Sequence, residues 1–119
     1  MALETDSKKV GSIAVLSLKG KITLGEGAQI LRKAVEDLVD QGSSNIVLDL
    51  ASVPFVDSAG LGALTVGFAR AKAAGGLLKL AGVQSRVRDA LEVTRLTRMF
   101  PLYESENQAV ASFASVTGQ

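Results

Sequence analysis

Residues 45–62, NIVLDLASVPFVDSAGLG, join an apolar run to a segment rich in glycine and other small residues. The run 45–50 is almost continuously apolar, which is typical of a central strand covered on both faces. Asp49 interrupts this run. Because a buried charge must be paired, Asp49 is expected to be a structural residue bonded to nearby backbone rather than a catalyst. Pro54 ends regular strand pairing, and the apolar spacing beyond it predicts a helix over 57–74.

The start of that helix carries residues that a helix does not ordinarily favour. Gly60, Gly62 and Gly67 fall within its first three turns, and each interior glycine costs about 1 kcal/mol relative to alanine. Asp57 and Ser58, just ahead, are residue types that cap helix N-termini with their side-chain oxygens. Two interpretations follow. The glycines let the helix pack tightly on its own sheet, or they keep a smooth surface where another protein docks beside a displayed serine.

Hydrophobic spacing on either side of this stretch predicts an alternation of strands and helices. Strands are expected at 2–9, 12–19, 77–80 and 99–103, and helices at 28–40, 85–97 and 105–113. In the helix 85–97, Val87, Leu91 and either Val93 or Thr94 are expected to face inward. The first two strands form a hairpin, and residues 45–81 form a parallel, right-handed βαβ unit. We therefore expect residues 1–119 to form a single α/β domain, with a mixed sheet of four to five strands and about four helices.

Composition argues against several classes of function. Thirteen basic and twelve acidic residues give a net charge of +1, which does not favour direct nucleic-acid binding. The chain has no cysteine and no histidine, so it lacks thiolate ligands, disulfides and the commonest general base. No metal and no cofactor are expected. The N-terminus has no apolar signal core, and no apolar run approaches the roughly 18 residues of a membrane helix. We expect a soluble cytoplasmic protein without membrane insertion.

The sequence contains no complete catalytic motif. Ser58 is not part of a GxSxG elbow, no histidine could activate it, and the P-loop and GxGxxG patterns are absent. Asp49 and Asp57 would make a poor carboxylate pair, because they are eight residues apart across a turn without a third polar partner. We therefore expect a protein that is not an enzyme. A serine that cannot be activated from within can still be modified by another enzyme.

The chain resembles the STAS family, which includes bacterial anti-sigma-factor antagonists and the cytoplasmic domains of sulphate transporters. The resemblance covers nearly the whole chain and rests on four segments: VLSLKGKITL, IVLDLASVPFVDSAGLGAL, GGLLKLAGV and LTRMFPLYESENQAVASF. The DSAGLG block directly after the IVLDL strand is the specific part. The other segments mainly restate the fold.

Resemblance to the antagonist branch implies a phosphorylation switch at Ser58. A kinase-type anti-sigma factor is expected to phosphorylate this serine. The unphosphorylated protein would bind that kinase and free the sigma factor, the phosphorylated protein would let go, and a serine phosphatase would restore the first form. Partner contacts are expected from the motif and from one loop residue: Asp57, Ser58, Ala59, Gly60, Leu61, Gly62 and Thr23.

Thr23 marks a departure from the family pattern. Family members often carry an acidic residue after a G-x-hydrophobic sequence, whereas Gly20-Lys21-Ile22 is followed here by Thr23. In the family fold this loop lies near the switch serine, so the change bears on which partner is bound. Thr23 is either a second phosphorylation site or simply a residue that favours β-structure.

The physics of a helix N-terminus fits such a switch. A phosphoryl group adds about −1.5 to −2 charges, and free N–H groups at the helix start tolerate an anion. The domain is expected to stay folded, so that the effect falls on the partner. Two other classes remain open. One is a STAS subunit that only acts as a scaffold in a transporter, lipid-transport complex or signalling assembly. The other is a small hydrolase that uses Asp49 and Asp57.

Overall fold

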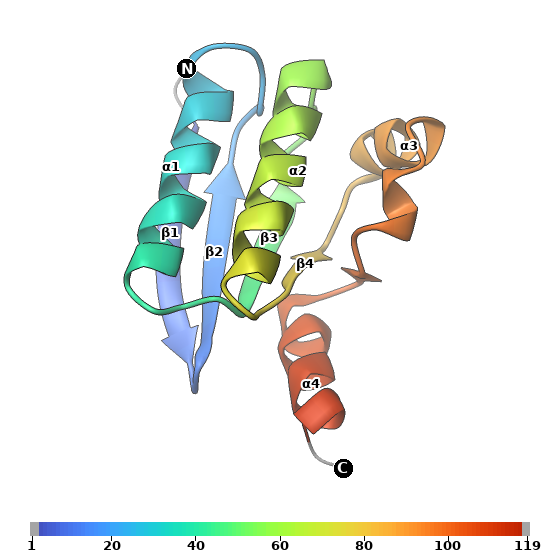
Figure 1. Cartoon of the computed structure of the whole chain (residues 1–119). Coiled ribbons are helices and arrows are strands. Elements are labelled where there is room, and N and C mark those ends of the chain that lie inside the picture. Colours follow the sequence, from blue (N-terminus) through green and yellow to red (C-terminus); the bar gives the residue numbers. More distant parts are fainter. Residues whose placement is uncertain (1–2, 118–119) are drawn as a thin grey trace.

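The computed structural model describes residues 3–117, and its centre is a five-stranded mixed sheet (Figure 1). The strands lie side by side in sequence order: β1 (Glu4–Val10), β2 (Ile13–Lys19), β3 (Ile46–Ser52), β4 (Leu78–Ala81) and β5 (Leu102–Tyr103). β1 is antiparallel to β2, and every other neighbouring pair is parallel. The N-terminal hairpin and the central parallel unit are thereby confirmed.

Four α-helices and one short 3-10 turn connect or follow the strands in the described part of the chain. They are α1 (Glu26–Asp40), α2 (Ser58–Ala73), α3 (Ser85–Val93), η1 (Leu96–Arg98) and α4 (Glu106–Thr117). α1 begins two residues earlier than expected, and α4 extends beyond residue 113. The expected α/β class with about four helices is confirmed.

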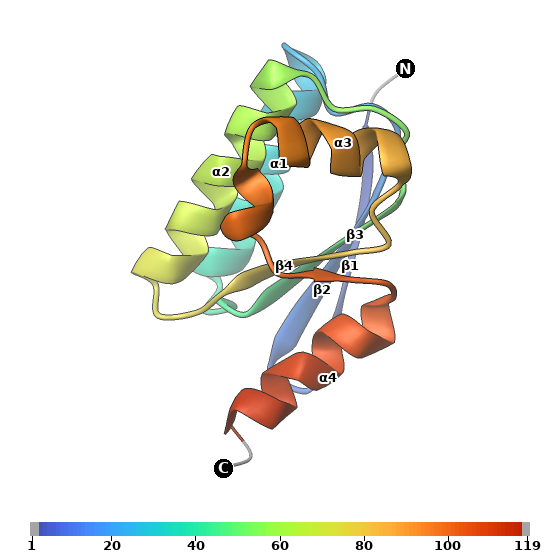
Figure 2. The ribbon, with the colours of Figure 1, turned by 90° about the vertical axis from the view of Figure 1, so that its right-hand side faces the viewer.

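The helices cover the two faces of the sheet unequally. α1 and α2 lie side by side over one face, and Figure 2 shows α4 on the opposite face. The side chains of β3 alternate between these faces. Leu48 belongs to the large core beneath α1 and α2, whereas Val47 packs in a smaller core with Phe113 of α4. Both β3 residues are fully buried, as expected of a central strand.

The glycines of α2 differ in the space around them. A Cβ atom at Gly60 would collide with the carbonyl oxygen of Ile22. At Gly67 it would lie 3.5 Å from Val35 Cγ2 of α1. Gly60 therefore serves close packing within the fold, whereas the distance at Gly67 is an ordinary van der Waals contact that an alanine would also make. Gly62 differs, because a Cβ atom there would meet nothing within 4 Å.

The expectation of one helix over 85–97 is wrong at its C-terminal end. α3 ends at Val93, and Arg95 takes a left-handed conformation with φ of 62° before η1. Val93 is 83% exposed and Thr94 is exposed, so neither faces inward. The Thr94 hydroxyl instead donates to the Ala90 carbonyl oxygen at 2.8 Å. This bond to the preceding turn helps to close the helix.

Candidate functional site

The loops that follow β2 and β3 meet at one edge of the sheet. The Ile22 N–H donates to the Phe55 carbonyl oxygen at 3.1 Å, and the Asp57 N–H donates to the Ile22 carbonyl oxygen at 3.3 Å. Ile22 and Val56 also form an isolated parallel bridge. The loop that carries Thr23 therefore lies against the turn that begins α2. In open α/β sheets this carboxyl edge is where ligands and partners collect.

Asp57 connects the start of α2 to the loop after β2 through two hydrogen bonds. It is the N-cap of α2, and its Oδ1 accepts the Gly60 N–H at 2.8 Å. Its Oδ2 accepts the Leu24 N–H at 2.9 Å. These backbone bonds, from Leu24 first and then from Gly60, lower the pKa of the Asp57 carboxyl from its ordinary value. The carboxylate therefore caps the helix and holds the neighbouring loop at the same time.

Ser58 is the first residue of α2 and is exposed. The cap is made by Asp57, so the expectation that Ser58 shares in it is not met. Within the described residues the Ser58 hydroxyl takes part in no hydrogen bond. It stands at the positive end of the helix, beside backbone N–H groups that lack intrahelical partners. A hydroxyl in this place is accessible to a modifying enzyme.

The other motif residues differ in what they present to a partner. Gly60 and Leu61 are buried and shape the surface from beneath, and Ala59 packs partly against the core. Gly62 is partly exposed and has open space above its Cα. Of the motif, Ser58 is therefore the most exposed position, and Asp57, Ala59 and Gly62 are partly exposed.

The loop after β2 supplies a further exposed residue that sequence analysis did not single out. Leu24 is 81% exposed, although its N–H is bound to Asp57. Thr23 beside it is partly buried. Both line a hollow of about 520 Å³ together with Lys21 and Pro54. The sequence feature that could have indicated the exposure of Leu24 is its position in a short loop, next to Thr23 and Gly25.

The start of α3 flanks the same edge with a cation. The Arg86 guanidinium lies 5.0 Å from the centroid of the Phe55 ring, in the loop after β3. Gln84, the residue before α3, donates from Nε2 to the Ala51 carbonyl oxygen at 2.7 Å. These contacts tie α3 to the loop after β3 and hold a positive charge beside it.

Asp49 belongs to a different cluster, on the sheet face that α4 covers. Its Oδ1 accepts the Ala51 N–H at 3.0 Å, as expected of a structural acid. Burial, and then a hydrogen bond with Glu106 of α4, raise the pKa of Asp49 from its ordinary value. Glu106 also contacts Lys8 Nζ at 3.0 Å, and the bonds from Asp49 and then Lys8 lower the pKa of Glu106. Asp49 and Asp57 share no partner, whereas the pairing with Glu106 was not foreseen.

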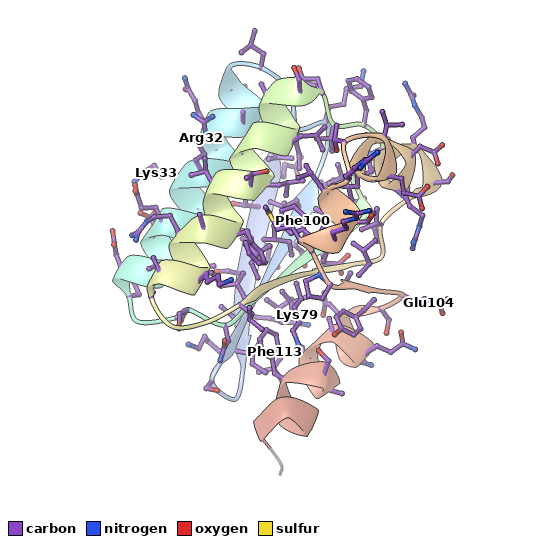
Figure 3. The ribbon with its side chains drawn as sticks, turned by 45° about the vertical axis from the view of Figure 1, so that its right-hand side comes forward. Arg32, Lys33, Lys79, Phe100, Glu104 and Phe113 are labelled. Atoms are coloured by element: carbon purple, nitrogen blue, oxygen red, sulfur yellow. The ribbon has the colours of Figure 1, made fainter. Side chains whose placement is uncertain are left out.

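Lys79 of β4 fixes the other end of the α4 contact. Its side chain is buried and points toward α4, close to Phe113 (Figure 3). The ammonium lies 4.1 Å from the centroid of the Phe113 ring and 5.5 Å from that of Tyr103, and it donates to Ser112 Oγ at 2.7 Å. A buried cation satisfied by aromatic faces and a hydroxyl holds the helix in place.

No group of three or more acidic residues in the described part of the chain is arranged to hold a metal ion. Among residues 3–117, no helix is both long enough and apolar enough to cross a membrane.

A family model for the STAS domain matches residues 4–109, so the chain belongs to the STAS domain family. Among curated relatives, it is 27% identical over 105 residues to BtrV of Bordetella bronchiseptica, which is provisionally named an anti-sigma factor antagonist. That alignment covers 88% of this chain and 90% of BtrV. The family resemblance inferred from the DSAGLG block is confirmed.

Solved structures agree on the fold. A crystal structure of an anti-sigma factor antagonist from Mycobacterium paratuberculosis superposes with a TM-score of 0.83, at 24% identity, over 93% of each chain. The Bacillus cell fate determinant SpoIIAA, solved in its phosphorylated form, superposes with a TM-score of 0.72 at 18% identity. The latter match covers 92% of this chain and 99% of SpoIIAA.

Proposed function

We propose that the chain is an anti-sigma factor antagonist that works as a phosphorylation-controlled partner-switching protein. Its unphosphorylated form binds a kinase-type anti-sigma factor in the cytoplasm, and phosphorylation of Ser58 by that kinase ends the contact. A serine phosphatase restores the binding form. The observation that carries this proposal is the division of roles at the start of α2. Asp57 makes the cap, which leaves the Ser58 hydroxyl exposed and unengaged within the described residues.

The charge at this position explains how modification would act on the partner rather than on the fold. A phosphoryl group on Ser58 would lie beside free backbone N–H groups, which tolerate an anion. It would shift the net charge from +1 to about −1. Because Asp57 precedes Ser58 in the sequence, the negative phosphoryl group would lie near the negative Asp57 carboxylate. A partner surface that had accepted a neutral hydroxyl would then meet two negative groups.

The docking surface is proposed to include the loop after β2 as well as the motif. Leu24 offers an exposed apolar side chain, and Thr23 stands where relatives often carry an acid. An exposed leucine beside a polar switch residue suits an anchor that fills an apolar pocket of the partner. The names of the relatives support the class of partner, since BtrV and the Mycobacterium protein are both described as anti-sigma factor antagonists.

Intact-mass measurement after incubation with a candidate kinase-type anti-sigma factor and ATP tests the modification. The parent chain is expected to gain one phosphoryl group, and Ser58→Ala is expected to gain none. Thr23→Ala removes the second hydroxyl on the same edge, and it should still gain one phosphoryl group, even if its change in the docking loop slows the reaction. Uptake of phosphate by Ser58→Ala at the parent rate would overturn the assignment.

Calorimetric titration of the same kinase tests the binding surface. Ser58→Ala should bind like the parent, and Ser58→Asp should bind at least about tenfold more weakly. Leu24→Ser should also weaken binding about tenfold. Val93→Ser is the matched control, because Val93 is 83% exposed against 81% for Leu24 but lies at the C-terminal end of α3. Equal binding by all four variants would favour the scaffold class over the switch.

A further inference from the structure

The two edges of the sheet are built very differently. β5 has only two residues and follows Pro101, so it offers almost no backbone for pairing. β1 has seven residues, all of them exposed. It pairs with β2 in an unbroken register from Glu4–Lys19 to Val10–Ile13, without a bulge. Natural edge strands are usually short, bulged, covered, or protected by proline or by charged side chains, especially lysine. β1 is long, regular and free of proline, and only its charged side chains, Lys8 and Lys9 among them, restrict what can pair with it.

The hairpin turn determines which backbone groups of β1 point away from the sheet. A two-residue turn, with Gly11 at φ of 63°, joins Val10 to Ile13. In such hairpins the residues that flank the turn exchange hydrogen bonds. The alternation along the strand then directs the N–H and C=O groups of Thr5, Ser7 and Lys9 to the open edge. Three residues therefore present unpaired donors and acceptors in a row about 14 Å long.

The charges of β1 are arranged so that the strand complements itself. Its sequence, ETDSKKV, places acids in the first half and lysines in the second. When two copies run antiparallel about Ser7, Asp6 of each lies opposite Lys8 of the other, and Thr5 lies opposite Lys9. Opposite charges directly across an antiparallel pair are stabilising. Lys8 can serve Glu106 of its own chain and Asp6 of the second copy, because an ammonium has three donors.

We propose that β1 is a homodimerisation edge, which pairs antiparallel with β1 of a second copy of this chain about a two-fold axis at Ser7. The product is a continuous ten-stranded sheet in which the open N–H and C=O groups of Thr5, Ser7 and Lys9 are satisfied. The interface is small, below the roughly 1,200 Å² of standard complexes, so the dimer is weak, with a Kd on the order of 100 μM. This surface lies at the other side of the sheet from β5 and does not include Ser58.

Sedimentation equilibrium from about 10 μM to 1 mM tests the association. The parent mass should rise from 12.3 kDa toward twice that value. Ser7→Pro should remain monomeric with an unchanged melting temperature, because its missing N–H faces the open edge. Ser7→Thr keeps the N–H and should associate like the parent. A parent chain that stays at 12.3 kDa throughout, or a Ser7→Pro chain that dimerises normally, would overturn the proposal.

Charge exchange tests the register. Asp6→Lys alone and Lys8→Asp alone should each associate at least about tenfold more weakly, because like charges then lie opposite. An equimolar mixture of these two variants should regain association, since the lysines of one chain then face the aspartates of the other. A mixture that stays as monomeric as its components would exclude this pairing. Thermal unfolding of each variant, followed by circular dichroism, checks that the fold keeps its stability when Lys8 is changed.

A cysteine scan tests the position of the axis, and the absence of cysteine from the chain makes it specific. Ser7→Cys places two thiols directly opposite each other, within the Cα separation that a disulfide allows, so mild oxidation should give a covalent dimer. Thr5 is also exposed on the same strand, but Thr5→Cys should not cross-link with itself, because Thr5 lies opposite Lys9. Efficient cross-linking of Thr5→Cys, with none for Ser7→Cys, would contradict the register.

Discussion

At the scale of single residues, Asp57 and Ser58 illustrate how adjacent polar side chains can take separate roles. Asp57 accepts from the N–H groups of Gly60 and Leu24, whereas the exposed Ser58 hydroxyl takes part in no hydrogen bond within the described residues. Sequence patterns place both residue types at helix starts, so they predict a cap without saying which of two neighbours makes it. Which of the two residues caps α2 depends on the position of the loop after β2, and the local spacing of residues does not predict that position.

Melting temperatures should separate the two roles. Ser58→Ala should change the melting temperature by no more than about 2 °C, because an exposed side chain outside the cap is removed. Asp57→Ala should lower it by about 5 °C, because two backbone N–H groups lose their acceptor. Thermal unfolding followed by circular dichroism measures both. If the two variants lost equally in melting temperature, Ser58 would have to contribute to the helix cap as much as Asp57 does.

The glycines of α2 provide a second contrast between neighbouring residues. Gly60→Ala should destabilise the protein by about 2 kcal/mol or more, because the new Cβ collides with the Ile22 carbonyl oxygen. Gly62→Ala should stabilise it by about 0.5–1 kcal/mol, because the site is open and alanine favours a helix. Urea unfolding of the two variants gives both values. If Gly62→Ala also weakens partner binding, its glycine is kept for the interface.

At the scale of elements, the apolar pattern was sufficient for the strands and for most helices. β3 and α2 follow the run 45–50 and the apolar spacing of 57–74, and the parallel β3–α2–β4 unit follows from their order. The end of α3 was missed because no glycine or proline marks it. Arg95 takes the left-handed conformation there, which sequence patterns assign to glycine or asparagine. The pairing of Asp49 with Glu106 was missed because the two lie on different elements.

The contact between β3 and α4 should make stability depend on pH. The raised pKa of Asp49 means that its ionised form is disfavoured in the fold, so stability falls as the pH rises from about 3.8 through the raised value. The lowered pKa of Glu106 acts oppositely, since its contribution is present above 4.5 and is lost as the pH falls through the lowered value. The folded protein is most stable when Asp49 and Glu106 together hold one proton, with Lys8 beside Glu106.

Asp49→Asn tests this account. The amide can donate permanently to Glu106 and still accept the Ala51 N–H. We expect the variant to lose the decline in melting temperature that the parent shows as the pH rises above about 3.8. Ser17→Ala is the control, because Ser17 only donates to Glu106 Oε2 at 3.4 Å and does not titrate near neutrality. An unchanged decline in Asp49→Asn would exclude the shared proton as its cause.

At the scale of the whole molecule, the architecture could be predicted from sequence. Each apolar run predicted one strand or helix, and the order of these elements along the chain predicted the hairpin and the parallel unit. The candidate site could be predicted only in part. Ser58 and the approach of the Thr23 loop were anticipated, whereas the exposure of Leu24 was not. The exposure of Leu24 depends on how the loops after β2 and β3 pack together, and the hydrophobic periodicity of the sequence does not predict loop packing.

The same architecture makes a prediction for the phosphorylated protein. Ser58 is exposed and belongs to neither hydrophobic cluster, and the helix N-terminus accommodates the anion. We expect the modified protein to melt within about 2 °C of the parent. Shifts of backbone amide resonances should be confined to residues 20–25 and the first turn of α2. A global change in the amide spectrum would show that modification remodels the fold itself.

The position of Lys79 gives the molecule a built-in optical reporter. The chain has one tyrosine and no tryptophan, so emission excited at wavelengths that phenylalanine does not absorb arises from Tyr103 alone. That ring lies 5.5 Å from the Lys79 ammonium, in the small cluster that also holds Phe113 of α4. Loosening of α4 would expose the phenol and alter its emission while the larger core stays intact. Unlabelled protein could thus reveal, by fluorescence alone, whether its last helix opens before the rest of the fold.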